Sequence, residues 1–567
     1  MGMAFNGLWR KVMKRDVSAL TDRKFDIVVV GGGIYGAAIV WDAALRGLDA
    51  ALIEKDDFGG NTSSNSLKII HGGLRYLQQL DIKRVRESVR ERRVMLTIAP
   101  HIVRPLSCVM PTYGHFMKGP EAMFCGTLLN DILSFDRNMG VDPMRKIPNC
   151  RVLSKQACLD MLPGIDSTSV NGGVFWTDAQ MYSSERLLLA FVLSAHVKGA
   201  AVANYVEAEH MLMSGSSVTG IRARDRMTGD TMDIQAKVVV NAGGAWAPQV
   251  LPVRADSSHV FRLSTAMNLV VDRQLFPDVA GGVYGSFSYK VPGSGMGSGR
   301  RVLFATPWRG RTIVGTFHRP YNREDISFAV TREEVDSFLK EINSAVPDAG
   351  LTAENVTYVQ KGFLPMDGIS SKNGEVLLTK HYSIVNHAKK DDIDGLVSVV
   401  GVKYTTARDV AEKVMDVAEK KVRGKITPSH SEYTSVAGGD MASVKEFQEE
   451  VAASVPDTFP ETVASHLAGS YGTGYKDVLD LLHELDGALI PGSDEVLEAE
   501  IYYAVREEAA LKLSDAVLRR TDLGSLGHPG KAALEKCADI MAAELGWDES
   551  RKQEEIAEVE SKYTQWA

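Results

Sequence analysis

Residues 25–55 contain a short apolar strand, a glycine turn, an alanine-rich helix and a second strand that ends in an acidic residue. The turn reads Gly31-x-Gly33-x-x-Gly36, and the acidic residue is Glu54. In such a unit the first glycine permits a tight turn, the second lets the backbone approach a pyrophosphate, and the third brings helix against strand. The helix N-terminus supplies amide donors for phosphates, and the carboxylate accepts hydrogen bonds from ribose hydroxyls. This spacing predicts a Rossmann-like dinucleotide site.

The glycine turn alone does not decide whether the cofactor is NAD or FAD. The segment after the turn distinguishes the two. An NAD-binding domain continues as regular βαβ repeats. Here the chain instead enters FGGNTSSNSLKIIHGGLRYL, a small polar loop without a helical apolar period. Small residues allow such a loop to lie close under a ribityl chain and a flavin ring. A second glycine turn ends at Asn241–Trp246 and a third lies at Gly401. Several discontinuous pieces around one extended cofactor favour FAD.

The rest of the chain alternates between helical and strand patterns. Helical apolar spacing is found at 81–98 and 184–198. Residues 100–180 are rich in turn formers and are expected to be irregular. The strand pattern at 217–242 predicts a hairpin with a buried strand. The patterns at 261–272, 300–317 and 355–364 predict an inserted antiparallel sheet, and the pattern at 396–422 predicts a final strand before a helix. From Ser443 onward the pattern is mostly amphipathic helix.

These elements predict an α/β fold with three parts. A Rossmann-like FAD-binding domain of the glutathione-reductase type carries an inserted antiparallel β-sheet domain for the substrate, and an all-helical C-terminal domain comes last. The expected boundaries are 1–24 for an N-terminal segment, 25–425 for the FAD-binding domain with its substrate part mainly at 100–180 and 255–390, and 430–567 for the helical domain.

Composition excludes several classes of protein. A chain of 567 residues predicts two or three domains, and a formal net charge of −8 argues against nucleic acid as a partner. The sequence contains no run of about 18 apolar residues, so no membrane-spanning helix is expected. The five scattered cysteines indicate free thiols rather than a disulfide framework, and no metal site is indicated. Because no signal peptide is recognisable, the cytoplasm is the expected compartment.

The N-terminal segment 1–24 differs in pattern from the dinucleotide-binding unit beside it. Its apolar residues recur at helical spacing: Phe5, Leu8, Trp9, Val12 and Met13. Its basic residues occupy the other faces: Arg10, Lys11, Lys14 and Arg15. This pattern suits a short helix on the inner face of the cytoplasmic membrane. A helix packed on the protein body, or a frayed terminus, accounts for the pattern equally well.

The segment TSSNSLKIIHGGLRYLQ (62–78) resembles the TSS…K-x-I-HGGLRYL stretch of the FAD-dependent glycerol-3-phosphate dehydrogenase/oxidase family of DAO-like flavoproteins. Further matching stretches occur in the family's order: VVVNAGGAW, VLFATPWRGRTIVGT, GVKYTTAR, TSVAGG and, at 500–521, EIYYAVREEAALKLSDAVLRRT. The resemblance implies hydride transfer from C2 of sn-glycerol 3-phosphate to flavin N5. It also implies that electrons pass to a membrane quinone, or to oxygen in the oxidase branch.

The resemblance also implies site residues. The reaction needs a base for the hydroxyl proton, positive charge near the reduced ring and an anion site for the phosphate. Arg75 is expected in the substrate pocket, Lys403 at a flavin or substrate oxygen, and His71 as the base or a flavin-edge donor. A structural histidine bonded to backbone is an equal alternative for His71. The residues expected at FAD are Gly31, Gly33, Ile34, Tyr35, Gly36, Glu54, Lys55, Thr62, Ser63, Ser64, Lys68, Gly72, Gly73, Leu74, Val206, Ala242, Gly243, Trp246, Gly401, Lys403, Thr405 and Thr406.

The substrate half departs from the family pattern. In the family's G-V-R-P-L the arginine contacts the substrate phosphate, and Leu364 stands in its place here. The family's G-S-H-I-V and G-T-T-D read AMNLV (266–270) and GTFH (315–318). Loss of a bidentate arginine–phosphate contact costs about 1.5–3 kcal/mol or more. We therefore hypothesise a larger polyol phosphate, or an unphosphorylated 2-hydroxy or 2-amino compound, as substrate. Four residues are candidates for compensating charge: Lys361, Lys380, His318 and Arg309.

Two further functions stay open. An FAD amine or hydroxy-acid oxidase would produce hydrogen peroxide, whereas a dehydrogenase would reduce a quinone analogue. A catalytically silent relative would keep FAD for structure, and no substrate would bleach its flavin. The helical domain 430–567 carries no catalytic constellation and is expected to cap the FAD domain or to form a subunit contact in a homodimer. Arg519 and Arg520 suit contact with an anion, but a solvated helix end is the commoner explanation for such a pair and is expected here.

Overall fold

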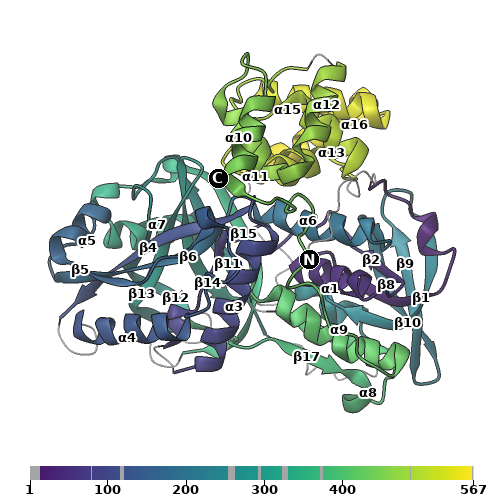
Figure 1. Ribbon diagram of the computed structural model, residues 1–567, viewed down its shortest axis with the longest axis horizontal. Helices are drawn as coiled ribbons and strands as arrows, with labels where there is room; N and C mark the ends of the chain where they lie inside the picture. The colour runs from purple at the N-terminus through teal and green to yellow at the C-terminus, as the bar shows by residue number, and fades with distance from the viewer. Residues whose placement is uncertain are drawn as a thin grey trace.

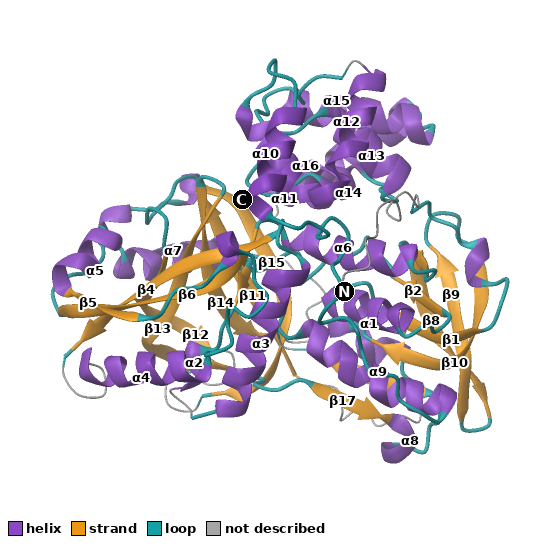
Figure 2. Cartoon of the chain, viewed as in Figure 1, coloured by secondary structure: helices purple, strands orange, loops and turns teal. Residues whose placement is uncertain are grey.

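Two β-sheets with flanking helices form the body of the molecule, and a helical domain lies across the same side of both (Figure 1 and Figure 2). This computed structural model describes residues 13–77, 80–114, 120–252, 262–291, 295–321, 330–370, 374–401, 403–485, 487–564 and 566. The predicted fold class is confirmed in each of its three parts.

The first sheet is the dinucleotide-binding sheet. Its strand order is β17-β18-β10-β1-β2-β7, and the strands from β18 to β7 run parallel. β8 and β9 continue from β10 as an antiparallel ribbon. The strands are β1 (Phe25–Val30), β2 (Ala50–Ile53), β7 (Ala201–Ala203), β8 (Val206–Ser214), β9 (Ser217–Asp225), β10 (Thr231–Asn241), β17 (Ser383–Asn386) and β18 (Leu396–Val400).

The central strand β1 is buried on both of its faces. Ile27 and Val29 pack in one apolar cluster with α1 (Ile34–Leu45), α6 (Ser184–Val197) and α9 (Ala407–Arg423). Val28 and Val30 point the other way, into a second cluster beneath β8 and β9. Because successive side chains of a strand alternate between its faces, a continuous apolar run such as Ile27–Val30 is what a doubly covered parallel strand requires.

The second sheet has the order β16-β15-β11-β14-β13-β12-β4-β6-β3, with β5 paired to β6. All of its neighbours are antiparallel except β4 and β12. α7 (Arg332–Ala345) packs on one face through a large apolar cluster. The strands are β3 (Ile69–Ile70), β4 (Val103–Tyr113), β5 (Arg151–Ser154), β6 (Val170–Met181), β11 (Arg262–Val271), β12 (Ala280–Val291), β13 (Gly295–Trp308), β14 (Arg311–Pro320), β15 (Val356–Ile369) and β16 (Val376–Leu378).

The expectation that residues 100–180 are irregular was wrong. β4 and β6 lie in this stretch and pair along their whole length. Because β6 is buried on both faces, it lacks the alternation that marks a half-exposed strand. α4 (Pro120–Leu133), α5 (Lys155–Met161) and β5 also fall here.

Other expected elements of the body are confirmed. The helix expected at 81–98 is α3 (Ile82–Ile98), which comes after the short α2 (Leu74–Leu77). At the other end of the substrate part, β17 and α8 (His387–Lys390) lie with the dinucleotide-binding sheet. Along the chain the second sheet therefore ends at Leu378, earlier than residue 390, the expected end of the substrate part.

The helical domain has two apolar cores. Its helices are α10 (Val444–Ser454), α11 (Glu461–Tyr471), α12 (Tyr475–Leu485), α13 (Glu498–Glu507), α14 (Leu513–Asp515), α15 (Lys531–Leu545) and α16 (Glu549–Thr564). A π-helical turn, Ala516–Arg520, comes directly after α14. Among the described residues no helix is long and apolar enough to cross a membrane.

Two arginines of the π-helical turn join the helical domain to the dinucleotide-binding domain, so the expectation of a solvated helix end was wrong. Arg520 donates to both carboxylate oxygens of Asp57, at 2.6 and 2.8 Å, and Arg519 donates to Asp57 at 2.5 Å. Burial opposes ionisation of this carboxyl, but the two guanidinium charges hold the pKa of Asp57 well below its usual value. Asp57 lies just after Glu54, so the helical domain supports the loop that leaves β2.

The end of the N-terminal segment packs on the body. Met13 is buried, and its amide donates to the carbonyl oxygen of Glu507. Arg15 donates to the carbonyl oxygen of Asn204 and pairs with Asp225. Residues 13–16 are not helical, so the helix expected in the N-terminal segment does not include them. Met13 and Arg15 instead contact the body of the protein. The expected membrane-facing residues from Phe5 to Val12 lie outside the described residues.

Candidate active site

The glycine turn joins β1 to α1 in a geometry that only glycine fits. Gly31 has a φ of +102°, and a Cβ there would lie 2.7 Å from the carbonyl oxygen of Ala242. A Cβ at Gly36 would overlap the carbonyl oxygen of Gly31. Gly33 is the N-cap of α1 and supplies no capping side chain. The first turn of α1 thus has amide groups that no N-cap side chain satisfies, as a phosphate site at a helix N-terminus requires.

Glu54 lies at the carboxyl end of β2, beside this turn. Its carboxylate accepts hydrogen bonds from the backbone nitrogen atoms of Gly32 at 2.6 Å and Asp56 at 2.9 Å. Burial raises the pKa of Glu54 to about 7 against the two hydrogen bonds, which lower it. Val206 donates its backbone N–H to the carbonyl oxygen of Glu54. The predicted ribose-binding residue is thus positioned by main-chain contacts on both sides.

Further predicted cofactor residues gather at the same edge of the sheet. The ammonium nitrogen of Lys55 lies 3.9 Å from the ring centroid of Trp246. Gly243 donates its backbone N–H to the side chain of Asn241, the last residue of β10. Because β1, β2 and β10 are parallel neighbours, their carboxyl ends meet at one edge, where doubly wound folds bind their ligands.

The predicted flavin loop connects the two sheets. Ser63 Oγ accepts a hydrogen bond from the backbone nitrogen of Ile34, in the first turn of α1. Thr62 Oγ1 accepts from the backbone nitrogen of Phe363 on β15, at 2.9 Å. Ser64 Oγ donates to a carbonyl oxygen within the loop. The loop therefore lies between the dinucleotide turn and the second sheet.

Lys68 has a structural role that the sequence did not indicate. Its side chain is fully buried, and Nζ lies 2.6 Å from both carboxylate oxygens of Glu185. Nζ also donates to Ser184 Oγ at 2.8 Å. The ammonium group is used within the protein, so a contact of Lys68 with the cofactor, which stays a prediction, would have to come from its other atoms.

The third glycine turn, after β18, is held against α1. The hydroxyl of Tyr35 donates to the carbonyl oxygen of Lys403 at 2.7 Å and accepts from its backbone nitrogen at 3.2 Å. A Cβ at Gly401 would overlap the Tyr35 ring. Thr405 and Thr406 are buried, and Thr406 is the N-cap of α9. Predicted residues from two distant segments thus meet where α1 and α9 begin.

His71 lies at the junction of the two sheets. Its backbone nitrogen donates to Thr405 Oγ1 at 3.1 Å, and its Nδ1 lies 3.6 Å from Asp178 Oδ2. Asp178, on β6, also accepts from the backbone nitrogen of Gly72 at 2.6 Å and from Arg92 at 2.8 Å. Burial would raise the pKa of Asp178, but its interactions with His71 and Arg92 lower the pKa to about 2.

Asp178 and Arg92 were missed from the sequence alone. Asp178 is 106 residues from Gly72 in the chain, so no local spacing joins them. The available signal was a charged residue inside the apolar run VFWTDAQM, because a buried carboxylate needs a partner. Asp178 fixes the backbone of the HGG motif, and His71 remains accessible, with 42% of its side chain exposed.

Two cations lie close to the ring of Tyr76 in the HGGLRYL motif. The ammonium nitrogen of Lys403 lies 3.8 Å from the ring centroid, and the guanidinium carbon of Arg84 lies 4.0 Å from it. Arg84 is buried, and among the described residues no carboxylate pairs with it. Neither Arg84 nor Tyr76 was predicted from the sequence. The side chain of Arg75 lies outside what the structure describes.

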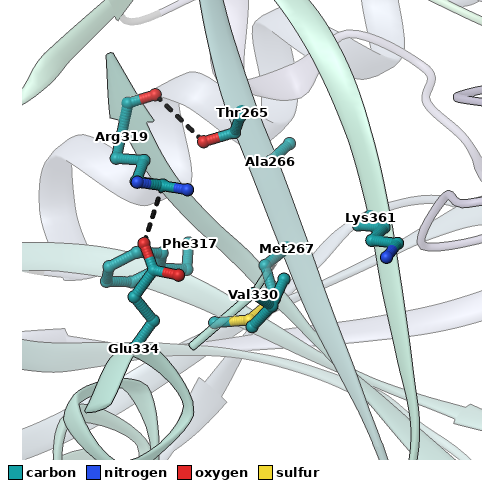
Figure 3. Close-up of a pocket in the computed structure, with 8 residues that line it drawn as sticks. All are labelled: Thr265, Ala266, Met267, Phe317, Arg319, Val330, Glu334 and Lys361. Atoms are coloured by element: carbon teal, nitrogen blue, oxygen red, sulfur yellow. Dashed lines mark hydrogen bonds and ion pairs between the residues drawn. The ribbon is translucent and has the colours of Figure 1, made fainter. Parts of the chain in front are cut away.

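Of the four candidates for compensating charge, Lys361 lies on the side of the second sheet away from the flavin loop. Figure 3 shows Lys361 in a pocket that Met267 also lines, and Met267 packs in the apolar cluster of α7. Arg319 and Glu334 form an ion pair in the same pocket. The neighbouring Gly362 faces Thr62 on the other side of the sheet, so Lys361 points away from the flavin loop.

Arg309 is buried in ion pairs with Glu495 and Asp522 of the helical domain. Lys380 is exposed, and the next residue, His381, lies 3.9 Å from Asp81 at the start of α3. His318 lies on β14 opposite Ala266. Lys380 and His318 therefore remain candidates.

The strands that depart from the family pattern carry an uncharged cluster. Thr316 Oγ1 donates to Asn268 Oδ1 at 2.9 Å, and Asn268 Nδ2 donates to Gln360 Oε1 at 3.2 Å. Asn268 and Gln360 are buried. These side chains offer hydrogen bonds but no charge, so a cation for a phosphate must come from other residues.

The residues at this site fit FAD. A Cβ at Gly31 would meet the backbone of Ala242, and a Cβ at Gly401 would meet the ring of Tyr35, so both turns depend on glycine for their close packing. The first turn of α1 has no N-cap side chain, and only its Ile34 amide donates to Ser63, so the turn suits a pyrophosphate. Glu54 suits ribose hydroxyls. The loop from Thr62 to Tyr76 and the turn at Gly401 are the elements that would hold the flavin ring.

The comparisons with known proteins agree with this arrangement. Residues 26–389 match the family model described as FAD dependent oxidoreductase, and residues 429–552 match that of the C-terminal domain of alpha-glycerophosphate oxidase. The chain is 30% identical to a glycerol-3-phosphate dehydrogenase of Synechocystis sp. across 96% of this chain and 97% of the relative. It is 31% identical to one of Mycobacterium leprae across 94% and 87%.

A solved structure has the same fold. The crystal structure of the glycerol-3-phosphate dehydrogenase from Bacillus halodurans complexed with FAD superposes with a TM-score of 0.71 at 24% identity. The superposition covers 97% of this chain and 96% of that one.

Proposed function

The chain belongs to the FAD-dependent glycerol-3-phosphate dehydrogenase/oxidase family, and from that premise we propose that it oxidises the secondary hydroxyl of sn-glycerol 3-phosphate or a related polyol phosphate. It is an oxidoreductase with FAD as cofactor. FAD, when bound, supplies a hydride acceptor at N5. The observation that carries the proposal is the buried carboxylate of Asp178, which holds His71 and Gly72 beside Thr405.

We assign the ADP half of FAD to the turn from Gly31 to Gly36, with Glu54 on the ribose. The flavin half falls to the loop from Thr62 to Leu74 and the turn from Gly401 to Thr406. Main-chain amides at the start of α1 hold the phosphates, because their N–H groups and the helix dipole both favour an anion.

His71 is the proposed base. Its Nδ1 faces Asp178, so Nε2 is the atom left to take the proton of the substrate hydroxyl. With a pKa of about 2, Asp178 stays ionised at neutral pH and stabilises the imidazolium that forms. Thr405, in the turn before α9, fixes the main chain of His71.

The cations around Tyr76 are the proposed anion site. Lys403 and Arg84 place two positive charges within about 4 Å of one ring. Such a pair can hold a phosphate where Leu364 cannot, since arginine and lysine both bind phosphate oxygens. In this proposal the phosphate-binding charge has moved from β15 to α3, and the substrate remains a polyol phosphate.

The proposed electron acceptor is a membrane quinone, and the proposed location is the inner face of the cytoplasmic membrane. Both reported relatives are named dehydrogenases, which supports an acceptor other than oxygen. Reduction of a quinone analogue without hydrogen peroxide is the expected result, and stoichiometric peroxide would contradict it.

An anaerobic flavin-reduction screen tests the reaction. The holoenzyme is mixed with sn-glycerol 3-phosphate, larger polyol phosphates, glycerol and 2-hydroxy acids, and the visible flavin band is followed. We expect bleaching by a polyol phosphate and none by glycerol. A specificity constant for glycerol 3-phosphate of about 10⁴–10⁸ M⁻¹ s⁻¹, the usual enzyme range, would exclude a larger substrate. Absence of bleaching across the panel contradicts the proposal.

A further inference from the structure

The π-helical turn of the helical domain contacts the dinucleotide-binding domain at a single carboxylate. Arg519 and Arg520 are consecutive residues of this turn, and both donate to Oδ2 of Asp57, at 2.5 and 2.6 Å. Arg520 also donates to Oδ1 at 2.8 Å. π-Helical turns are rare in proteins and are frequent at functional sites. Asp57, Arg519 and Arg520 are called the Asp57 junction below.

The Asp57 junction is closed to solvent. Asp57 and Arg520 are each 1% exposed. Asn204 Nδ2 donates to Asp57 Oδ1 at 3.1 Å and to the carbonyl oxygen of Ala509 at 2.9 Å, and Arg520 donates to the carbonyl oxygen of Glu508 at 3.1 Å. Loss of one partner from a buried ion pair leaves an uncompensated charge, so the position of Asp57 depends strongly on its arginines.

Asp57 belongs to a loop, residues 54–60, that holds the glycine turn. The carboxylate of Glu54 accepts a hydrogen bond from the backbone nitrogen of Gly32 at 2.6 Å. From the other end of the loop, Gly59 donates its backbone N–H to the carbonyl oxygen of Gly32 at 3.0 Å. Both main-chain polar groups of Gly32 are therefore bonded to the loop that carries Asp57.

Arg519 and Arg520 are not themselves part of the glycine turn. In the described part of the chain neither of them donates a hydrogen bond to it. Any influence of the two arginines on the turn therefore passes through Asp57 and the loop 54–60. Since Asp57 and Arg520 are 463 residues apart, this influence would join the last domain of the chain to the first cofactor-binding element.

We infer that Arg519 and Arg520 are positioning residues for the ADP half of FAD, which they support by holding Asp57 and with it the loop 54–60 against the glycine turn. Docking of the helical domain and binding of FAD then favour each other, because a coupling between two equilibria is reciprocal. The inference rests on the proposed function only in its assignment of the ADP half to the turn from Gly31 to Gly36.

Titration of the full-length apoprotein with FAD tests the inference. Arg520→Leu is expected to bind FAD about 10- to 100-fold more weakly, the range for loss of a charge-assisted contact. Arg520→Lys keeps the positive charge and is expected to recover part of that loss. A junction that only docks the helical domain would lower the thermal stability of Arg520→Leu and leave its FAD affinity unchanged, which would overturn the inference.

Arg301→Leu is the matched control for this titration. Arg301 is a buried arginine that donates to both carboxylate oxygens of Glu341, at 2.7 and 2.6 Å, on the α7 side of the second sheet. Its loss breaks an ion pair of the same geometry at a place remote from the loop 54–60. Arg301→Leu is expected to lose thermal stability and to bind FAD as wild type, and an equal loss of FAD affinity in both leucine variants would contradict the inference.

A double-mutant cycle shows whether Arg520 acts through Asp57. Asp57→Asn removes the charge that both arginines contact, so its FAD affinity should fall at least as far as that of Arg520→Leu. Because residues in direct contact act as a unit, Asp57→Asn/Arg520→Leu is expected to bind FAD no more weakly than Asp57→Asn alone. Additive losses would give Arg520 another route to the cofactor site and would overturn the inference.

Competition by ADP locates the effect within the cofactor. ADP is the part of FAD that the turn from Gly31 to Gly36 is proposed to hold. In Arg520→Leu the inhibition constant of ADP against FAD should rise by the same factor as the Kd of FAD. A loss of affinity for FAD without a loss for ADP would place the effect at the flavin half and contradict the inference.

Hydrogen exchange of the wild-type chain tests the reciprocal effect and does not depend on the folding of any variant. FAD is expected to slow exchange of the backbone amides at 54–60 and at 511–525. It should leave exchange in α10 unchanged, because α10 packs in a different apolar core of the helical domain from the π-helical turn. Exchange at 511–525 that does not respond to FAD would overturn the inference.

Failure of the inference can be told apart from failure of the proposed function. If Gly36→Ala binds FAD as wild type, the assignment of the ADP half is wrong and the inference falls with it. If Gly36→Ala loses FAD while Arg520→Leu keeps it, only the inference is wrong. Weaker binding of FAD and ADP by Arg520→Leu, in an enzyme whose flavin no polyol phosphate bleaches, would support the inference and contradict only the proposed reaction.

Discussion

In the sheet built from β1, β2 and β10, main-chain groups shape the site, whereas in the sheet built from β11, β14 and β15 side chains do. Around the dinucleotide turn the close approaches involve backbone atoms of Gly31 and Ala242 and amides at the start of α1. On the second sheet the groups available for hydrogen bonds are the side chains of Asn268, Thr316 and Gln360.

This contrast explains why one half has the family pattern and the other departs from it. A backbone site tolerates only glycine at its closest contacts, so the pattern has little freedom to change. A side-chain site can lose a cation from one strand and regain it from another element, as we propose for Leu364 and Arg84. Substitutions in each half test that difference, and the largest effect is expected in the backbone half.

Gly36→Ala is expected to abolish FAD binding. The new Cβ would overlap the carbonyl oxygen of Gly31, so helix and turn would have to separate. Such overpacking costs about 3 kcal/mol, or more than a hundredfold in FAD affinity. The flavin-to-protein absorbance ratio of the purified variant measures the loss. Gly368→Ala, on β15, is the matched control because a Cβ there meets no atom within 4 Å. A fully loaded Gly36→Ala enzyme would show that the turn is not limited by its backbone.

Asp178→Asn is expected to lower kcat by about 10²–10⁴, with FAD content and KM little changed. The substitution removes the negative charge opposite His71 and breaks the ion pair of Arg92 with Asp178. Steady-state kinetics at saturating substrate measure the effect. Trp176→Phe removes only the neutral donor to Asp178, at 3.1 Å, and is expected to cost about tenfold or less. Equal losses in the two variants would assign Asp178 a structural role alone.

The sequence predicted what local physics determines and missed what the fold brings together. The turn at Gly31, the capped helix α3 and the parallel strand β1 are each determined by residues within one short segment. β6 was missed because burial on both faces removes the alternation that reveals a strand. Asp57 and Arg520 are separated by 463 residues, so neither segment alone indicates their pairing.

The same limit applied to the candidate site. His71 and Lys403 could be selected from motifs, but their partners Asp178 and Tyr35 come from other elements. The motif that selected Lys68 gave a residue type without its partner, and the partner of its ammonium group is Glu185. Arg84 carried no signal, since one more arginine in a charged helix is ordinary.

Arg84→Leu is expected to raise KM for a polyol phosphate by about 10- to 100-fold, the value of one charge-assisted contact, with kcat nearly unchanged. Lys83→Leu, an exposed neighbour on the same helix, is the control and should leave KM unchanged. Adding Leu364→Arg to Arg84→Leu should recover part of the lost affinity if phosphate charge can move between β15 and α3. An unchanged KM in Arg84→Leu would place the phosphate elsewhere.

Glu54 links the backbone half to pH. Because its pKa in the folded protein is about 7, above the ordinary 4.5, the protonated form is favoured in the absence of FAD. Glu54 therefore stabilises the apoprotein fully below pH 4.5 and loses that contribution as the pH rises to 7. FAD needs the carboxylate as acceptor, so its affinity should show the opposite trend and weaken up to about tenfold from pH 8 to pH 6. In Glu54→Gln both trends should vanish from titrations of apoprotein with FAD and from thermal unfolding. If the stability of the apoprotein and the affinity for FAD both fall as the pH rises in the wild type, Glu54 does not hold the ribose.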